Sequence, residues 1–171
     1  MSAADAEASL LGACLSAAYA LPAALGEGVR EEDFERPSHR AIWRAMLAVN
    51  SRLADGEAID PLLVTAELNG ELELVGGRAY VHSLVTACPI VSNARQYARE
   101  VLDGSLTRKV RGILMDLQES PLSGEELLTE LQDRAFALER QPREARTMRQ
   151  AFEEVYREAE SPTRAVCSYP W

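Results

Sequence analysis

Residues 92–141 read SNARQYAREVLDGSLTRKVRGILMDLQESPLSGEELLTELQDRAFALERQ, and this stretch decides the fold class. Ser92 or Asn93 can cap a helix that reaches about Glu119. Apolar residues recur along this helix at the spacing that places them on one face. They are Tyr97, Val101, Leu106, Val110, Ile113, Leu114 and Leu117. The pattern predicts one long amphipathic helix.

A second helix is predicted to return along the first. Ser120-Pro121 ends the first helix, and Ser123 with Glu126 has the S-x-x-E spacing of a capping box. The returning helix carries its own apolar stripe of Leu127, Leu128, Leu131, Ala135 and Leu138. Two long helices joined by a short turn predict an antiparallel hairpin. Such a hairpin has two apolar seams and buries only one of them well.

Helical spacing also dominates residues 1–91, where strand signals are nearly missing. A first helix is expected to bury one stripe of Leu10, Leu11, Cys14, Leu15 and Ala18. Pro22 then breaks or restarts it. The segment from Val29 to Arg36 is acidic and irregular, and we expect an exposed loop held by Phe34.

Three further helices follow before residue 92. The first begins at Pro37 and reaches about Leu53, and the second has Asp60 as its N-cap before Pro61. A loop with Gly76-Gly77 leads into the third. The residues expected to be buried on these helices are Ile42, Trp43, Met46 and Leu47, then Leu63, Val64 and Leu68, then Tyr80, Val81, Leu84 and Val85.

Beyond Gln141-Pro142 a last amphipathic helix is expected from about Thr147, with Met148, Ala151, Phe152, Val155 and Tyr156 on one face. The predicted fold is therefore all-α, with a small helical bundle as head, an antiparallel helical hairpin and a linker helix. We place the head in residues 1–91, the hairpin arm of the same domain in residues 92–141, and the linker helix with an extended tail in residues 142–171.

Composition narrows the class of partner. The 171-residue chain is 47% apolar and carries a formal charge of −9, which disfavours a broad surface that neutralises phosphates, so we expect no strong nucleic-acid binding. The longest apolar stretch, Leu10 to Leu25, is interrupted and too short to span a membrane. Three widely spaced cysteines without a C-x-x-C pair favour a reduced cytoplasm.

No catalytic, metal or cofactor residue is predicted. Lys109 is the only lysine and does not follow a glycine, so the sequence has no G-x-x-x-x-G-K-[ST] loop for ATP. His39 and His82 lack a second ligand at i+3 or i+4, and we expect His39 to donate a hydrogen bond near the Phe34 loop. The pairs Glu31-Glu32 and Glu153-Glu154 are interpreted as solvated charge.

The hairpin and the last helix carry apolar stripes that need a partner. The four helices before Ser92 supply enough apolar faces to close a head by themselves, which leaves these stripes uncovered within the chain. Uncovered apolar stripes of this size indicate association. We therefore expect self-assembly or partner docking rather than a closed monomer.

One string resembles a known family. Asp33 to Trp43, DFERPSHRAIW, resembles the D-F-x-R-P-x-H-R-x-I-[FW] signature of the N-terminal domain of DnaB-family replicative DNA helicases. Glu7 with LLGA at 10–13, GGRAY at 76–80, and Asn93 with YAR at 97–99 and Val101 resemble further family motifs, in the family's order. The signature positions are Asp33, Phe34, Arg36, Pro37, His39, Arg40, Gly76, Gly77, Tyr80, Asn93 and Tyr97.

The resemblance implies a collar domain. In that family, heads and hairpins pair into dimers, and three dimers form a collar over a hexameric ring of ATPase domains. The collar receives primase and, in some bacteria, a loader. The resemblance then implies ATP and Mg²⁺ only in the full-length parent, an ATP-dependent DNA helicase. The expected contacts between arms are Leu106, Val110, Leu114, Leu117, Leu127, Leu131 and Leu138, and those with the motor domain are Phe152, Val155 and Tyr156.

Two other functions remain open from the sequence. A free-standing phage or accessory protein made of this domain would bind the replicative helicase or primase as an adaptor or inhibitor. A helical small-molecule binder would need a polar-lined pocket that the sequence does not display. At the end of the chain, Tyr169-Pro170-Trp171 stands where the family continues with a threonine-glycine-phenylalanine step, so the join to a motor domain departs from the family pattern.

Overall fold

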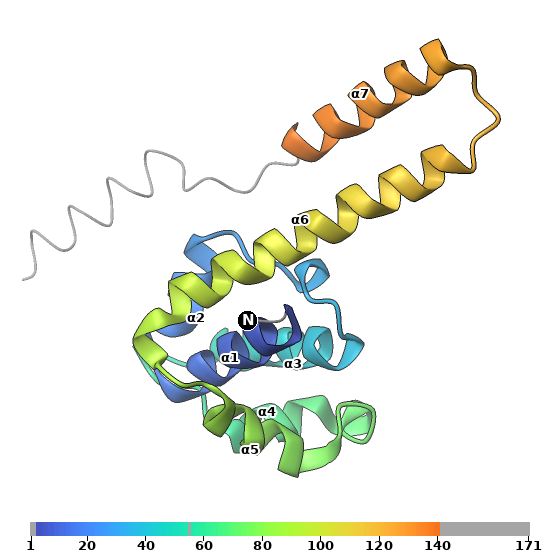
Figure 1. Cartoon of the computed structure of the whole chain (residues 1–171). Helices are drawn as coiled ribbons and strands as arrows, with labels where there is room; N and C mark the ends of the chain where they lie inside the picture. Colours follow the sequence, from blue (N-terminus) through green and yellow to red (C-terminus); the bar gives the residue numbers. More distant parts are fainter. Residues whose placement is uncertain (1–2, 55, 141–171) are drawn as a thin grey trace, which may run out of the picture. The chain divides into compact units, whose positions relative to one another are not determined.

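The computed structural model describes residues 3–54 and 56–140 (Figure 1). Every regular element in these two ranges is a helix, which confirms the all-α prediction. The α-helices are α1 (Ala3–Ser16), α2 (Ala20–Gly26), α3 (Pro37–Asn50), α4 (Pro61–Leu68), α5 (Gly77–Ala87), α6 (Ala94–Gln118) and α7 (Gly124–Arg140). Short 3₁₀ turns are η1 (Glu31–Asp33), η2 (Asn69–Glu71) and η3 (Val91–Asn93).

Helix α1 is the central helix of the fold. It contacts α2, α3, α5 and α6, and Figure 1 shows it between α6 and α5. Its sequence explains this position, because apolar residues lie on several of its sides and a helix of that kind must be covered all round. The predicted stripe is buried from Leu10 to Leu15, but α1 ends at Ser16, so Ala18 lies outside the helix.

Gly12 allows α1 and α5 to cross closely. A Cβ atom at residue 12 would lie 2.0 Å from the backbone oxygen of Leu84 and 3.0 Å from the Cβ of Cys88. Both distances are far below van der Waals contact, so any residue with a side chain would push the two helices apart. The family-like string that contains Gly12 therefore has a packing reason.

Pro22 lies in the first turn of α2, so the chain does restart a helix there. Proline is tolerated at this point because the first turn of a helix needs no internal N–H donor. In the segment that follows, Phe34 is fully buried as expected. The prediction of an exposed loop is wrong for Val29 and Asp33, which are buried too. Val29 joins the apolar core, and the Asp33 carboxylate is held by hydrogen bonds that the sequence did not reveal.

Helices α3, α4 and α5 begin where the sequence indicates. Pro37 is the first residue of α3, and the Asp60 carboxylate accepts a hydrogen bond of 2.7 Å from the Leu62 N–H. Gly76 takes a left-handed φ of 96° immediately before α5, a conformation that glycine adopts without strain. Helix α3 ends at Asn50, three residues before the predicted Leu53.

The burial of α4 differs from the prediction at one position. Leu63 is 46% exposed, whereas Val64, Thr65 and Leu68 are buried. Residues 64, 65 and 68 lie on one face of the helix, and Leu63 lies about 100° away from Val64 around its axis. Because α4 is a short helix at the edge of the head, only one of its faces is buried, and Leu63 lies on the exposed side.

The first half of α6 belongs to the core of the head. Ala94, Tyr97, Ala98, Val101 and Leu102 are buried in the same apolar cluster as α1. The expectation that the four helices before Ser92 close the head by themselves is therefore wrong. Helix α1 is apolar on the side that α6 covers, so the head needs this fifth helical segment. From here on, "head" means residues 3–54 and 56–105.

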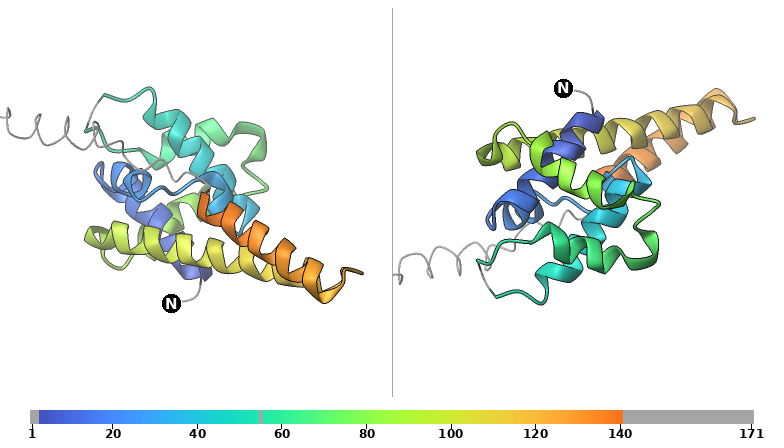
Figure 2. Two further views of the ribbon diagram at one scale, coloured as in Figure 1. Left: turned by 90° about the horizontal axis from the view of Figure 1, so that it is seen from above. Right: turned by 90° about the horizontal axis from the view of Figure 1, so that it is seen from below.

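The second half of α6 and all of α7 form the predicted hairpin. Both views in Figure 2 show α6 continuing beyond the head with α7 beside it. The two helices contact each other, and the turn between them is fixed by Ser123, whose N–H donates to the Glu126 carboxylate at 2.8 Å. Helix α6 runs through Gly104 and Gly112 without a break.

Candidate interaction surface

A buried polar network joins three helices of the head. Glu7 of α1 and His39 of α3 are 1% and 0% exposed, and Oε2 of Glu7 lies 2.6 Å from Nδ1 of His39. The other ring nitrogen of His39 lies 2.6 Å from the hydroxyl of Tyr80 on α5. A carboxylate only accepts, so Nδ1 carries the proton, and in a neutral imidazole Nε2 accepts from the tyrosine. His39 was expected near the Phe34 loop, and its two partners were not foreseen.

The surroundings of Glu7 set its charge state. Burial alone would raise its pKa, but the hydrogen bonds from His39 and from the Glu35 N–H outweigh burial and leave the pKa below the usual 4.5. Glu7 is therefore ionised at neutral pH. The Tyr-His-Glu order resembles a catalytic relay, yet Glu7 and His39 are closed to solvent within the core. The network is a structural link between α1, α3 and α5.

The other signature residues of the sequence are structural as well. The ring of Phe34 packs against Trp43 with centroids 5.2 Å apart, and Arg40 Nε donates to the Phe34 carbonyl at 2.7 Å. Arg36 occupies the N-cap position of α3, although its side chain makes no cap bond. Asn93 precedes α6 in the same way and also makes no side-chain cap bond. These signature residues therefore stabilise the packing of the head, and they do not form a reaction centre.

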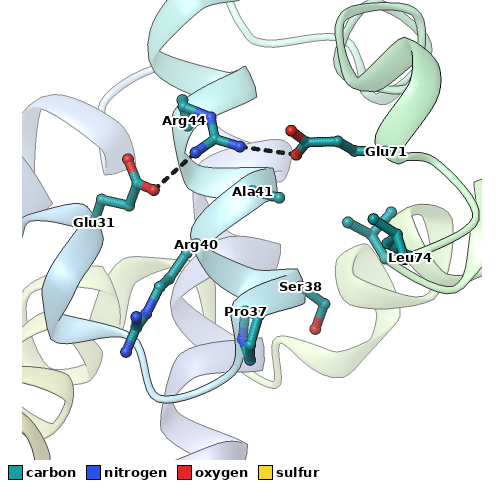
Figure 3. A pocket seen from close by; sticks show the side chains of 9 residues that line it. Glu31, Pro37, Ser38, Arg40, Ala41, Arg44, Glu71 and Leu74 are labelled. Carbon is teal, nitrogen blue, oxygen red and sulfur yellow. Dashed lines mark hydrogen bonds and ion pairs between the residues drawn. The ribbon is translucent and has the colours of Figure 1, made fainter.

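One surface depression of about 410 Å³ lies beside α3 (Figure 3). Its lining is charged at one end, where Arg44 bridges Glu31 at 3.0 Å and Glu71 at 2.8 Å. The interpretation of Glu31 as solvated charge is thus refined, because this exposed carboxylate has an arginine partner. Leu74 is the large exposed apolar residue of the lining. Arg40 also lines the depression, and its Nε donates to the backbone carbonyl of Phe34.

The hairpin exposes a larger set of apolar side chains. Four of the seven residues predicted to mediate assembly are exposed, and we call them the hairpin surface: Leu106 (44%), Val110 (41%), Leu114 (51%) and Leu131 (37%). Leu127 and Leu138 are half-buried. Leu117 is only 9% exposed, because other residues of its own chain cover it.

Burial along the inner stripe of α6 falls from the turn toward the head. Leu117 is buried, Ile113 is half-buried, and Val110 and Leu106 are exposed. These residues lie on one face because they are spaced by three or four positions. Near the end of α6, Asp116 pairs with Arg134 of α7 at 3.1 Å. The two helices therefore share a covered seam near the turn and leave the same stripe uncovered toward the head.

Sequence reasoning missed several exposed apolar residues of the hairpin. Met115 and Phe136 lie about 180° around their helices from the stripes of Leu106 and Leu127. Both are more than half exposed, and Leu122 in the turn is 38% exposed. Leu128, which the predicted stripe of the returning helix does include, is also more than half exposed. The available signal was their apolar character at positions where a surface helix is usually polar. The hairpin is thus apolar on more than one side.

Other predicted features lie partly outside the described residues. Phe152, Val155 and Tyr156 fall in the undescribed range 141–171, so their docking role stays a prediction. Within residues 3–54 and 56–140, no cluster of three or more histidine, cysteine or acidic side chains is placed to hold a metal. No helix in those ranges is long and apolar enough to cross a membrane. Cys14 is a buried core residue, as expected, and burial raises the pKa of its thiol to about 12.

The described residues thus form an all-α domain, a helical head from which a hairpin with exposed apolar side chains continues. Residues 1–103 match the family model of the DnaB-like helicase N-terminal domain, and the chain belongs to this family. The replicative DNA helicase DnaB of Geobacillus stearothermophilus is 36% identical over 134 residues, which are 77% of this chain and 28% of that protein. The replicative DNA helicase DnaC of Bacillus subtilis is 36% identical over 108 residues, or 62% of this chain and 23% of that protein.

Solved structures show the same fold. The crystal structure of the N-terminal domain of the Mycobacterium tuberculosis DnaB helicase aligns with a TM-score of 0.68 and 32% identity, covering 78% of this chain and 95% of that one. A structure of a DnaB-like replicative helicase and its interactions with primase aligns with a TM-score of 0.62 and 20% identity, covering 92% of this chain and 34% of that one. The chain thus spans about a quarter of the length of the curated helicases it resembles.

Proposed function

We propose that this chain is the N-terminal collar domain of a hexameric replicative DNA helicase, in which hairpins pair subunits into dimers and three dimers form the ring. The observation that carries the proposal is the hairpin surface, which the helices in residues 3–54 and 56–140 leave exposed. The membership of the chain in the family of DnaB-like helicase N-terminal domains supports the same assembly. The contribution of the domain is geometric, because it holds motor domains together and takes no part in the chemistry.

A second copy of the chain fits the hairpin surface better than an unrelated partner. Among the described residues, the inner stripe of α6 is covered near the turn and exposed toward the head, as expected for a hairpin that forms half of a four-helix bundle. A second hairpin would supply matching apolar stripes and complete four helices around one core. Neighbouring charges are of both signs, with Asp116 and Arg134 already paired, so two copies would not repel each other strongly.

We also propose that the assembled collar docks primase, with a helicase loader as a further partner. Support comes from the structure of a DnaB-like replicative helicase of the same fold, which was solved to describe its interactions with primase. ATP and Mg²⁺ would bind a motor domain of the intact helicase, which the similarity to full-length replicative helicases suggests. Phe152, Val155 and Tyr156 remain the residues proposed to contact that motor domain.

Sedimentation of the full chain tests the assembly. Replacing Leu106 and Leu114 by serine removes two apolar side chains of the hairpin surface, and we expect the dimer dissociation constant to rise by about tenfold or more. The matched control replaces Tyr19 and Leu25 by serine, since both are exposed apolar residues at α2 of the head. A chain that stays monomeric at every concentration would refute the collar model. An unchanged dissociation constant in the double variant would move the contact to another surface.

Primase docking is tested separately. Calorimetric titration of the chain with the helicase-binding domain of a primase should show binding to the associated form, and the Leu106 and Leu114 double variant should bind more weakly. A chain that forms dimers and binds no primase would leave assembly in place and remove the docking role.

A further inference from the structure

Asp33 is a buried charge with an unusual set of partners. It is 6% exposed, and its Oδ2 accepts a hydrogen bond of 2.9 Å from the Arg30 N–H. Its Oδ1 accepts a hydrogen bond of 2.6 Å from the Ser105 hydroxyl and lies 3.5 Å from Nζ of Lys109. Ser105 is 72 residues away along the chain, so the contact is purely tertiary.

The contact continues along one face of α6. Residues 105, 108 and 109 are spaced i, i+3 and i+4, which places them together on that face. Arg108 Nη2 donates to the backbone oxygen of Asp33, and its Nη1 lies 3.6 Å from the Glu35 carboxylate. The segment of residues 30–36, which we call the signature loop, thus holds three side chains from a single turn and a half of α6.

This turn is the one at which α6 leaves the head. Leu102 and Ser105 are buried, whereas Leu106 is 44% exposed. Gly104 lies beside the exit, with Ala3 as the nearest side chain at 3.5 Å from where its Cβ would be. Glycine weakens a helix by about 1 kcal/mol relative to alanine, and glycine is a site at which helices bend. The contacts of Asp33 with α6 therefore lie at the turn around Gly104, where the helix leaves the head and is most easily bent.

The signature loop is itself fixed to the core. The Glu35 N–H donates to Oε1 of Glu7 at 2.5 Å, and Phe34 is fully buried against Trp43. Arg40 of α3 also donates to the Phe34 carbonyl. A force on the arm at Ser105 would consequently be carried through the loop to α1 and α3, which are the centre of the head.

We infer that the signature loop is a brace that sets the direction in which the hairpin leaves the head, with Asp33 as its central positioning residue. The apolar core includes α6 as far as Leu102, and the polar contacts with the signature loop continue to Lys109, about two helical turns further. This inference deepens the proposed function, because two hairpins can pair at a fixed geometry only if each has a fixed direction. The brace would therefore contribute to assembly by preorganisation, without touching the partner.

The direction of the arm is measurable in the full chain without assembly. Spin labels at Arg78→Cys on α5 and Gln118→Cys at the end of α6 report the distance between head and arm, since both positions are exposed. Cys88→Ser and Cys167→Ser remove the other reactive thiols, and Cys14 stays because it is fully buried. Measurements are made at a dilution where the chain is monomeric.

Three variants separate the brace from general stability. Asp33→Ala removes the carboxylate contacts with Ser105 and Lys109 and leaves those of Arg108 with the Asp33 backbone oxygen and with Glu35, and we expect the distance distribution to broaden by about twofold. Ser105→Ala removes only the 2.6 Å hydrogen bond and should broaden it less. Glu27→Gln is the matched control, because Glu27 also pairs with α6, through Arg99 at 2.9 Å, but in the half that the core already holds. The distance distribution between the two spin labels should not change in Glu27→Gln.

The outcomes distinguish the inference from the proposed function. A distribution that stays narrow in Asp33→Ala and Ser105→Ala, with both variants folded by circular dichroism, would overturn the brace. Broadening together with a dimer dissociation constant raised about tenfold in Asp33→Ala supports both the brace and its role in assembly. Broadening without any change in dimerisation would keep the brace and remove its link to assembly. If the parent chain never dimerises, the proposed function fails while the distance measurement still tests the brace.

Discussion

At the scale of single residues, the head depends on polar groups placed inside an apolar core. Glu7, His39 and Tyr80 are far apart in sequence and are joined by two hydrogen bonds of 2.6 Å. Buried polar groups of this kind cost free energy unless every one is paired. The ionised Glu7 carries the charge of the network, because its hydrogen bonds hold its pKa below the ordinary value.

Glu7→Gln should destabilise the chain in a pH-dependent way. At pH 7 the free energy of unfolding should fall by about 2 kcal/mol, since a charged hydrogen bond is replaced by a neutral one. The folded-state pKa of Glu7 is lowered below 4.5, so its contribution is present above that value and is lost as the pH falls through the folded-state pKa. The difference between parent and variant in urea unfolding should therefore shrink on acidification.

Glu67→Gln is the control for this prediction. Glu67 pairs with Arg52 on the surface, where an ion pair contributes at most about 1 kcal/mol. A difference between the parent and Glu7→Gln that stays constant from pH 7 to about pH 3 would show that the charge of Glu7 does not stabilise the head.

At the scale of elements, the head is defined by how closely its helices cross. The α1–α5 crossing brings the Leu84 carbonyl to where a side chain of residue 12 would be. The local sequence does not indicate that residue 12 must be glycine, because glycine in a helix interior is unfavourable for the isolated helix. Gly112 on α6 is the opposite case, since a Cβ there would meet no atom within 4 Å.

Alanine at these two glycines should have opposite effects. Gly12→Ala should destabilise the chain by about 2–3 kcal/mol, because α1 and α5 must separate. Gly112→Ala should stabilise α6 by about 0.5–1 kcal/mol, because it only restores helix propensity. Thermal unfolding followed by circular dichroism measures both. Equal effects of the same sign would contradict the close crossing.

At the scale of the whole described structure, α6 belongs to both head and hairpin. Its first half completes the core around α1, and its second half presents the hairpin surface. A cut at residue 91 therefore does not separate a finished head from its arm. The brace between Asp33 and Lys109 extends the contact of the head to the turn beyond the core.

Two fragments test this division. A fragment of residues 1–91 should lack cooperative unfolding, because it loses Ala94, Tyr97 and Val101 from the core. A fragment of residues 1–110 keeps these residues and the brace, so it should unfold cooperatively and stay monomeric. Differential scanning calorimetry distinguishes the two. A cooperative transition in the shorter fragment would show that the head closes without α6.

The sequence by itself determined where the helices begin and to which family the chain belongs. Pro37, Asp60, Gly76 and Ser123 mark helix starts through bonds or φ preferences within a few residues, so neighbouring sequence is sufficient. The same local periodicity predicted the hairpin and most of its apolar stripe.

Only the tertiary structure decided which faces meet. The pairing of Glu7 with His39, the contact of Asp33 with Ser105 and the burial of Leu117 all join segments separated along the chain. Periodicity states that a stripe is apolar but not what covers it, because burial depends on the crossing of helices that local sequence does not specify. For that reason the hairpin surface begins at Leu106, the first apolar residue of α6 that the head does not cover.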